Sequence, residues 1–256
     1  TGDVTYAWPM YDPRKTGALK ETEPFWYVKV NYLAPARRNG EALLVWDSVN
    51  ALKQGRRAWQ YLPGQRRVKL APDIAYDTPN PGTAGSTTYD DASVFNGAMD
   101  RFEFKLIGKK EMYVPYSNYR LIYEAKSADI TKPGHLNPDY IRWELHRVWV
   151  VEATLKPDKR HIYSKRVFYL DEDSWVALAS DEYDGHGRLY RAGFAYPSFS
   201  YDAQTHWTDT QGHYDFTSGM YNINGLVSNH AGVKYLPETP GGSYWEPEAL
   251  AGAGIR

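Results

Sequence analysis

Apolar and polar side chains alternate along most of this 256-residue chain, in short runs that end at Pro, Gly, Asn or Asp. In residues 24–35, for example, Trp26, Val28, Val30 and Tyr32 share one parity between two bounding prolines. An alternation of period two places every second side chain on the same face, which is typical of a half-buried β-strand. The pattern therefore predicts a protein built mainly from antiparallel strands.

The clearest turn lies within residues 56–72, where two aromatic and basic runs meet at Pro63-Gly64. Proline fixes φ at about −65° and glycine tolerates the positive φ that follows, so we expect a β-hairpin with Gly64 at positive φ. A second hairpin turn is predicted at residues 184–187, and further strands are predicted within 105–121 and 140–194. Together these runs predict one large, twisted antiparallel sheet.

Two neighbouring runs have matching apolar faces. In residues 142–152 the large apolar side chains, among them Trp143 and Trp149, share the odd positions, and in 161–170 Phe168 and its apolar partners share the even ones. Because the turn at 156–159 joins the two runs, we expect both faces to point to the same interior.

Each of these apolar faces also contains one arginine, Arg147 in the first run and Arg166 in the second. An unpaired charge in an apolar interior costs several kcal/mol. We therefore expect each guanidinium to contact a carboxylate, backbone carbonyls or a ligand head group.

Helical signals are few. Residues 87–102 form the best candidate helix, with Thr88 as N-cap, Asp91 in capping-box spacing and an end at Asn96-Gly97. Asn137-Pro138 indicates a second helical turn of a few residues. Residues 72–88 are rich in turn-forming residues and predict a long functional or mobile loop.

Composition limits the function. Lys and Arg number 30 against 31 Asp and Glu, and the net charge of −1 disfavours nucleic acid as a partner. The mean hydropathy is −0.63, and no apolar run approaches the roughly 20 residues of a transmembrane helix. The chain has no Cys, which excludes thiolate chemistry, and its 22 Tyr and 9 Trp suit a sheet with one partly wet face.

Motifs for catalysis or metal binding are missing from the sequence. Seven His residues occur without a His-x-His or HExxH spacing, and we interpret His206 and His213 as polar turn and strand residues instead of metal ligands. There is no Gly-x-Ser-x-Gly elbow and no P-loop. We predict no metal, no cofactor and no enzymatic activity, although a triad or carboxylate pair assembled from distant residues stays open.

Several long strings carry a family resemblance: FNGAMDRFEFKLIGKKEMYVPY, GHLNPDYIRWELHRVWVVEATLKP, RHIYSKRVFYLDEDSW and YDGHGRLYR. From about residue 41 through the C-terminal tail, the chain resembles a family of bacterial envelope proteins described as outer-membrane lipoprotein-sorting-protein-like, in the LolA/LolB-like superfamily. The resemblance implies a mainly β fold, in which a large twisted antiparallel sheet forms a half-open barrel with one or two short helices. It also implies longer members, with a secretory leader and a further N-terminal portion.

We expect residues 1–256 to form a single domain of this fold, with 237–256 as an extended C-terminal tail docked through Trp245. In such a fold the barrel hollow accepts acyl chains. The resemblance therefore implies a non-enzymatic periplasmic carrier or receptor for a lipid, a lipoprotein acyl chain or another hydrophobic compound, peripheral to the outer membrane and linked to an RND-type exporter.

Strand parity and the surplus of rigid aromatic side chains give the ligand-binding candidates. They are Trp59, Tyr61, Trp143, Arg147, Trp149, Arg166, Phe168 and Trp175. Two alternatives remain: a structural or interaction subunit of an envelope complex whose barrel is filled by its own side chains, and a hydrolase.

Overall fold

The structure, a computed structural model, describes residues 1–12, 14–228, 232–236 and 238–254. The chain groups into two compact units. Unit 1 comprises Thr1–Ala75 and Leu236–Arg256, and unit 2 comprises Tyr76–Tyr235. Each unit is described by itself, and the expectation of a single domain stays a prediction.

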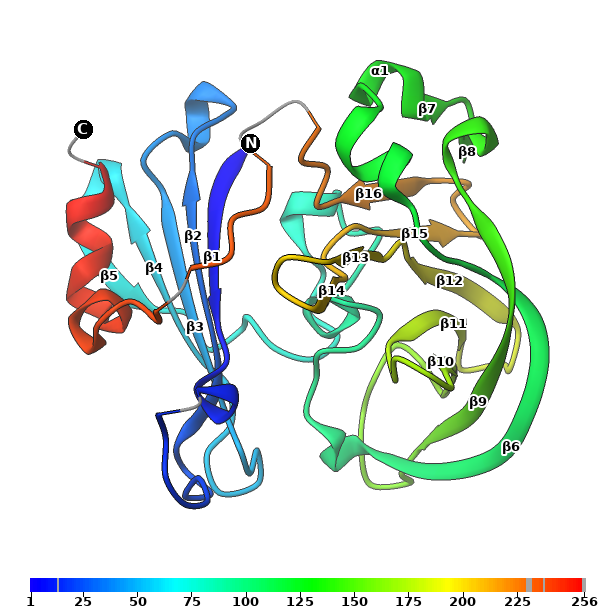
Figure 1. The fold of residues 1–256 in the computed structure, drawn as a ribbon. Helices are drawn as coiled ribbons and strands as arrows, with labels where there is room; N and C mark the ends of the chain where they lie inside the picture. The colour runs from blue at the N-terminus through cyan, green and yellow to red at the C-terminus, as the bar shows by residue number, and fades with distance from the viewer. Residues whose placement is uncertain (13, 229–231, 237, 255–256) are drawn as a thin grey trace. The chain divides into compact units, whose positions relative to one another are not determined.

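Unit 1 contains a five-stranded antiparallel sheet in which consecutive strands are neighbours (Figure 1). Its strands are β1 (Gly2–Ala7), β2 (Pro24–Tyr32), β3 (Ala42–Ser48), β4 (Arg57–Leu62) and β5 (Arg67–Leu70). The predicted hairpin of β4 and β5 is present, but its turn differs from the expected one. Pro63–Gln65 forms a single 3-10 turn, and Arg66 instead of Gly64 takes the left-handed conformation, with φ 50°.

The C-terminal tail packs on one face of this sheet, as Figure 1 shows for its red helical turns. Trp245 is 4% exposed, stacks on Tyr27 at 5.1 Å between ring centroids, and accepts a hydrogen bond at its carbonyl oxygen from Trp46 Nε1 at 3.0 Å. Leu250 is fully buried in the same cluster. The tail is thus docked through Trp245, and it folds into 3-10 turns at Gly242–Trp245 and Pro247–Gly254.

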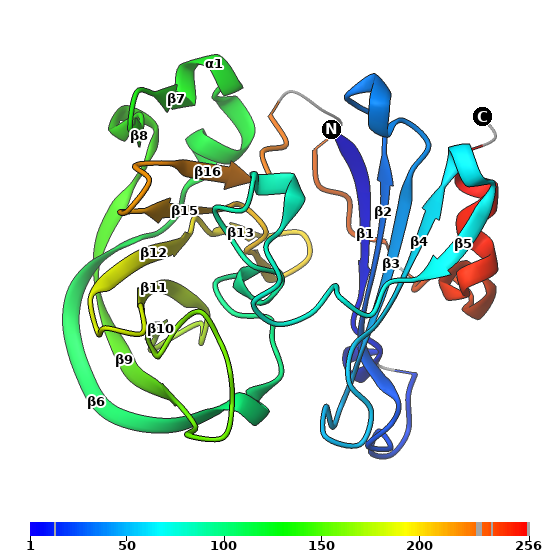
Figure 2. The ribbon, with the colours of Figure 1, turned by 180° about the vertical axis from the view of Figure 1, so that it is seen from behind.

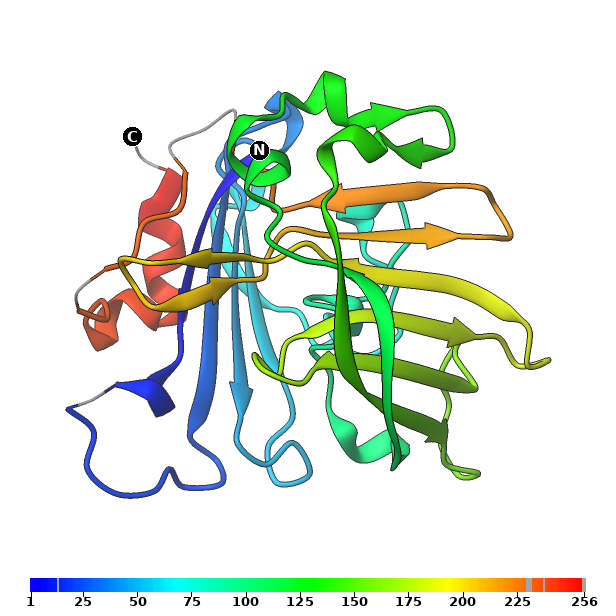
Figure 3. The same ribbon diagram turned by 45° about the vertical axis from the view of Figure 1, so that its right-hand side comes forward.

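Unit 2 contains a seven-stranded antiparallel sheet with the order β16-β15-β12-β11-β10-β9-β6 (Figure 3). Its strands are β6 (Phe102–Pro115), β9 (Trp143–Leu155), β10 (Lys165–Asp171), β11 (Ala177–Tyr183), β12 (Leu189–Ala195), β15 (Gln211–Asp215) and β16 (Tyr221–Asn224). Two small hairpins accompany it: β7 (Thr131–Lys132) with β8 (His135–Leu136), and β13 (Ser198–Ser200) with β14 (Thr205–Trp207). In the described residues β6 and β16 are edge strands, so the fold is mainly β with a half-open sheet.

Helical structure is short, as the sequence indicates. Unit 2 contains α1 (Ser127–Ile130) and a π-helical turn at Arg120–Glu124. The remaining helical segments of the described residues are 3-10 turns, which in addition to those above are Pro9–Tyr11, Ala36–Arg38, Pro81–Thr83, Tyr89–Asp91, Met99–Arg101 and Pro138–Tyr140. The last of these begins at the predicted Asn137-Pro138 signal, with Asn137 Oδ1 accepting from the Asp139 N–H at 3.2 Å.

The helix predicted over residues 87–102 is wrong. Only the 3-10 turns Tyr89–Asp91 and Met99–Arg101 form there, and Ser93 and Val94 between them have positive φ values of 53° and 70°. The predicted capping residues do meet, because Thr88 N–H donates to Asp91 Oδ2 at 2.7 Å. The capping box therefore starts one turn, after which the chain leaves the helical conformation.

The predicted parity of β9 and β10 is confirmed by their register where the two strands pair, whereas Trp143 at the start of β9 is 44% exposed. Phe168 lies opposite Val151, and Leu170 lies opposite Trp149, so these side chains share a face. Val94 and Phe95 of residues 76–101 pack on that face. We call residues 76–101 the covering segment; Figure 2 shows it beside β10–β12.

The opposite face of the sheet is also packed. Val114 of β6, Val148 of β9 and Leu178 of β11 are fully buried together. Further along, Leu121 and Tyr196 belong to a second apolar cluster, which includes residues from the β7–β8 hairpin and from β15 and β16. The space between β6 and β11 is therefore filled by side chains.

Candidate functional site

A buried group of charged side chains lies between the sheet of unit 2 and the covering segment. Arg166 on β10 is fully buried, and its Nη2 donates to Asp91 Oδ1 at 2.9 Å and to the Val94 carbonyl oxygen at 3.0 Å. Its Nη1 lies 3.5 Å from Asp90 Oδ1. The prediction that Arg166 is buried and paired is thus confirmed, and its partners are two consecutive carboxylates.

The two carboxylates lie at the end of the capped 3-10 turn Tyr89–Asp91, and Thr88 holds both of them. Asp91 Oδ2 accepts from the Thr88 N–H, and Asp90 Oδ1 accepts from Thr88 Oγ1 at 2.6 Å. The chain then reverses through residues of positive φ, which directs Val94 into the core. Asp90 and Asp91 are both 1% exposed.

The segment between β9 and β10 and the strand β12 complete this arrangement. Tyr163 Oη donates to Asp91 Oδ2 at 2.9 Å, and His161 Nε2 lies 3.0 Å from Asp90 Oδ2. On β12, Arg191 Nε donates to Asp215 Oδ2 at 3.0 Å, and Nη1 donates to Tyr163 Oη at 3.2 Å. Burial would raise the pKa of Asp90, but Arg166 and His161 outweigh it and hold that pKa well below its usual range.

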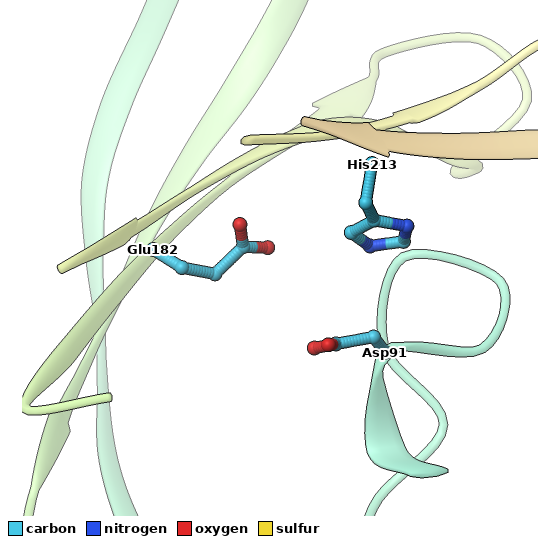
Figure 4. Close-up of side chains that lie close together, drawn as sticks. All are labelled: Asp91, Glu182 and His213. Atoms are coloured by element: carbon cyan, nitrogen blue, oxygen red, sulfur yellow. The ribbon is translucent and has the colours of Figure 1, made fainter. Parts of the chain in front are cut away.

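Glu182 on β11 and His213 on β15 extend toward Asp91, and Figure 4 shows the three side chains converging. Each offers one ligand atom, and these atoms all lie within 4.8 Å of one another. Burial and the Asp91 charge raise the pKa of Glu182 to about 8. Burial lowers the pKa of His213 to about 4, so its imidazole is neutral at pH 7.

The histidine ring has space because of a glycine in a central strand. A Cβ on Gly193 of β12 would lie 2.7 Å from His213 Nε2 and 2.7 Å from Ser180 Oγ. Glycine inside a strand weakens it and marks a close approach of other atoms. A cavity of about 40 Å³ borders Asp91 and His213, and the rest of its lining is mainly amide and hydroxyl side chains.

The ligand-binding candidates from the sequence lie in different places. Trp59 and Tyr61 belong to unit 1, where both pack in the cluster of Trp245 and Leu250. The other six belong to unit 2. Of these, Arg166 and Phe168 are buried beneath the covering segment.

The remaining four lie on β9 and on the turn that follows β10. The rings of Trp149 and Trp175 stack with centroids 6.0 Å apart, and Trp175 is 65% exposed. Trp143 is 44% exposed at the start of β9. Lys109 of β6 lies over the Trp149 ring at 4.1 Å. We call the following residues the β9 outer surface: Trp143, Leu145, Arg147, Trp149 and Trp175, with Leu106, Lys109 and Tyr113 of β6.

Arg147 is a correction to the sequence analysis, which placed its side chain in an apolar interior. The side chain is 55% exposed and lies 3.5 Å from Glu111 and 3.6 Å from Glu172. The reason is the length of β10, whose pairing with β9 ends at Asp171 opposite Val148. Residues of β9 before Val148 have no β10 strand beside them, so this part of the apolar face is open to solvent.

A larger cavity of about 280 Å³ lies elsewhere in unit 2. Its lining comes from the start of the π-helical turn and from the chain between the turn at Pro138–Tyr140 and β9, and it consists of Ser117, Asn118, Arg120, Asp139, Tyr140, Ile141 and Arg142. None of the eight candidates belongs to this lining.

His206, which the sequence analysis considered together with His213, does not lie beside it in the site. Its ring contacts Phe199 at 5.1 Å and Tyr116 at 6.0 Å between centroids. The sequence analysis also missed the functional groups around His213, namely Asp90, Asp91, Glu182, Arg191 and Asp215. No spacing signal links them, because they come from the covering segment and three separate strands.

Comparisons with known proteins identify the family and structures of similar fold. A family model described as "Protein of unknown function (DUF1329)" matches residues 1–251. An uncharacterized protein of Pseudomonas aeruginosa is 43% identical over 247 residues, a match that covers 96% of this chain and 53% of that protein. The chain therefore spans about half the length of this relative.

Two solved structures have a similar fold. One is a putative outer membrane lipoprotein-sorting protein domain from Vibrio parahaemolyticus, with a TM-score of 0.55 and 15% identity over 91% of this chain and 80% of that one. The other is a DUF1329 family protein from Desulfovibrio piger, with a TM-score of 0.56 and 19% identity over 88% and 77% of the two chains. The resemblance seen in the sequence is confirmed by the family match over residues 1–251 and, at the level of fold, by the similarity to the lipoprotein-sorting protein domain. In the described residues no helix has the length and apolar character needed to cross a membrane.

Proposed function

From the premise that this chain belongs to the family described as "Protein of unknown function (DUF1329)", we propose that it is a non-enzymatic periplasmic carrier or receptor for a hydrophobic compound. The ligand class we propose is a lipid or lipoprotein acyl chain. The β9 outer surface is the proposed contact site. The fold supports this proposal, since a domain of similar fold is described as a putative lipoprotein-sorting protein.

The observation that carries the proposal is the exposure of large apolar side chains along β6 and β9. Leu106 is 59% exposed, Leu145 58% and Tyr113 67%. Tyr113 lies opposite Leu145 in the β6–β9 ladder. Exposed apolar patches on a folded domain mark places where other apolar groups bind. Here the charged pair of Glu111 and Arg147 lies between Tyr113–Leu145 and Trp149 in the ladder.

Cations lie beside these apolar groups. Lys109 and Arg147 flank Trp149, and both form ion pairs with Glu172. A lipid with a carboxylate or phosphate head group would bind Lys109 and Arg147 in place of Glu172. Ten methylenes moved fully out of water would contribute about 8 kcal/mol at about 0.8 kcal/mol each, which is within the range of about 4–15 kcal/mol that association costs.

The test is a titration of the protein with palmitate, followed through tryptophan fluorescence and native mass spectrometry. We expect one fatty acid to bind, and Trp149→Ala and Trp175→Ala to weaken binding at least tenfold while circular dichroism stays unchanged. Trp8→Ala is the matched control, because Trp8 is an exposed tryptophan of unit 1 at 47% exposure. Binding that is absent, or that responds equally to all three substitutions, would contradict the proposal.

A structural or interaction subunit is the second candidate, favoured by the filled space between β6 and β11. Val114 and Leu178 leave no exposed surface there, as both are fully buried. The β9 outer surface would then contact a protein, for which an RND-type exporter is our proposed partner. Cross-linking in intact cells from a photoreactive residue at position 145 distinguishes the two, since a lipid carrier gives a lipid adduct and an interaction subunit gives a protein adduct.

A further inference from the structure

We propose that Asp91, Glu182 and His213 bind a divalent transition-metal cation, with Zn²⁺ as the best match. This inference is independent of the ligand proposed for the β9 outer surface. It concerns a buried site, whereas that surface is exposed.

The first step is convergence. The three side chains come from the covering segment, from β11 and from β15, and their ligand atoms lie within 4.8 Å of one another (Figure 4). Ligand atoms at about 2.0–2.2 Å from one tetrahedral Zn²⁺ lie about 3.3–3.6 Å apart. Small rotations of the side chains therefore suffice to bring all three into the coordination shell.

The second step is that two of the three side chains, Glu182 and His213, have buried polar atoms without a hydrogen-bond partner among the described residues. His213 is 1% exposed, and both of its ring nitrogens lack a hydrogen-bond partner among the described residues. Glu182 is fully buried, and its Oε2 also lacks a partner there. Leaving a buried polar atom unsatisfied costs about 1–3 kcal/mol. A cation between these atoms would satisfy both side chains at once.

The third step is charge. Asp90, Asp91 and Glu182 face a single interior guanidinium, that of Arg166, because Arg191 pairs with Asp215. Two further titratable side chains pack against these carboxylates besides His213: His161 contacts Asp90, and Tyr163 Oη donates to Asp91. With all three carboxylates ionised, the group carries an excess of two negative charges, and burial beside Asp91 accordingly favours the protonated form of Glu182 when no cation is bound. One divalent cation would neutralise that excess.

The fourth step is support around the ligands. Asp91 accepts hydrogen bonds from Arg166, Tyr163 and the Thr88 N–H, and Glu182 Oε1 accepts from Ser180 Oγ. Carboxylate ligands of metal ions are commonly oriented by such outer hydrogen bonds. The cavity of about 40 Å³ beside Asp91 and His213 has room for about one water molecule, which could complete the coordination.

The choice of metal follows from the ligand atoms. One imidazole and two carboxylates suit Zn²⁺ or Mn²⁺, whereas Ca²⁺ and Mg²⁺ prefer an all-oxygen shell. A second group, His146 with Asp171 and Asp173, also has three ligand atoms within 4.8 Å. However, Asp173 is exposed, and His146 Nδ1 lies 2.8 Å from Asp171 Oδ1, so this histidine already has a partner. It supplies the matched control.

The experiment is isothermal titration of chelator-treated, untagged protein with ZnCl₂. We expect one equivalent of Zn²⁺ to bind and Ca²⁺ to bind at least 100-fold more weakly. Glu182→Gln and His213→Leu should each lower the Zn²⁺ affinity at least 30-fold, and His146→Ala should change it less than threefold. Absence of Zn²⁺ binding, or loss of binding with His146→Ala and not with His213→Leu, would overturn the proposal.

A measurement on the unsubstituted protein covers the case in which a variant fails to fold. Hydrogen–deuterium exchange with and without ZnCl₂ should show at least tenfold slower exchange at residues 88–94, β11 and β15. Protection confined to the region of His146 and Asp171 would overturn the proposal.

Discussion

Replacing Arg166 with methionine tests whether the buried charges hold the covering segment on the sheet. The change removes the donor to Asp91 at 2.9 Å and the cation beside Asp90 at 3.5 Å, and it leaves both carboxylates buried. Breaking a buried ion pair on one side costs about 3–5 kcal/mol. At about 2–4 °C per kcal/mol for a chain of this size, Tm should fall by roughly 10 °C.

The assay combines urea denaturation, followed by circular dichroism, with hydrogen exchange of the β10 amides. Exchange is needed because the two compact units need not unfold in one transition, and β10 reports on unit 2 alone. Arg147→Met is the matched control. Its exposed ion pairs contribute less than about 1 kcal/mol. If Arg166→Met cost no more than Arg147→Met, the electrostatic account of the covering segment would be refuted.

Three further predictions concern other parts of the chain. Gly193→Ala should destabilise unit 2 by about 1–3 kcal/mol because its Cβ meets atoms at 2.7 Å, whereas Gly185→Ala in an open turn should be neutral in the same urea titration. Trp245→Ala should cost about 3–5 kcal/mol and speed the exchange of β3 amides, and unchanged β3 exchange would contradict the docking role of the tail. Burial raises the pKa of Asp171, but hydrogen bonds from Ser174 outweigh it and lower the pKa. The stability that Asp171 contributes is therefore present above its unfolded pKa of about 3.9 and is lost as pH falls. The urea midpoint of Asp171→Asn should be lower than that of the parent at pH 7, and the two midpoints should converge at low pH.

The strands and their buried faces could be predicted because apolar and polar residues alternate along each strand, so the signal lies within a few neighbouring residues. The shared face of Phe168 and Val151 follows from parity alone. Arg147 shows the limit of parity, which identifies a face and not the extent of the neighbouring strand. Since β10 stops opposite Val148, the same face is buried in one half of β9 and exposed in the other.

The helix over 87–102 failed for a different reason. Its capping residues are correct, yet Asp90 and Asp91 contact His161 and Arg166, which lie more than 70 residues away in the chain. Such distant partners override local propensity. The convergence of Glu182 and His213 was unpredictable on similar grounds, because β12 lies between their strands and no sequence spacing encodes that neighbourhood.

The covering segment has a consequence for how the chain folds during synthesis. The covering segment leaves the ribosome before β10, β11, β12 and β15. Asp90 and Asp91 therefore cannot pair with Arg166 until 75 residues beyond Asp91 have been synthesised. The sheet face onto which the covering segment docks has Arg, Glu and Asp side chains beside the apolar Phe168 and Ala153, and the charged ones stay hydrated until docking. A nascent sheet with this face attracts other chains less than an apolar one would. Docking requires contacts from strands that are distant in sequence, so we expect it to be a late step of folding.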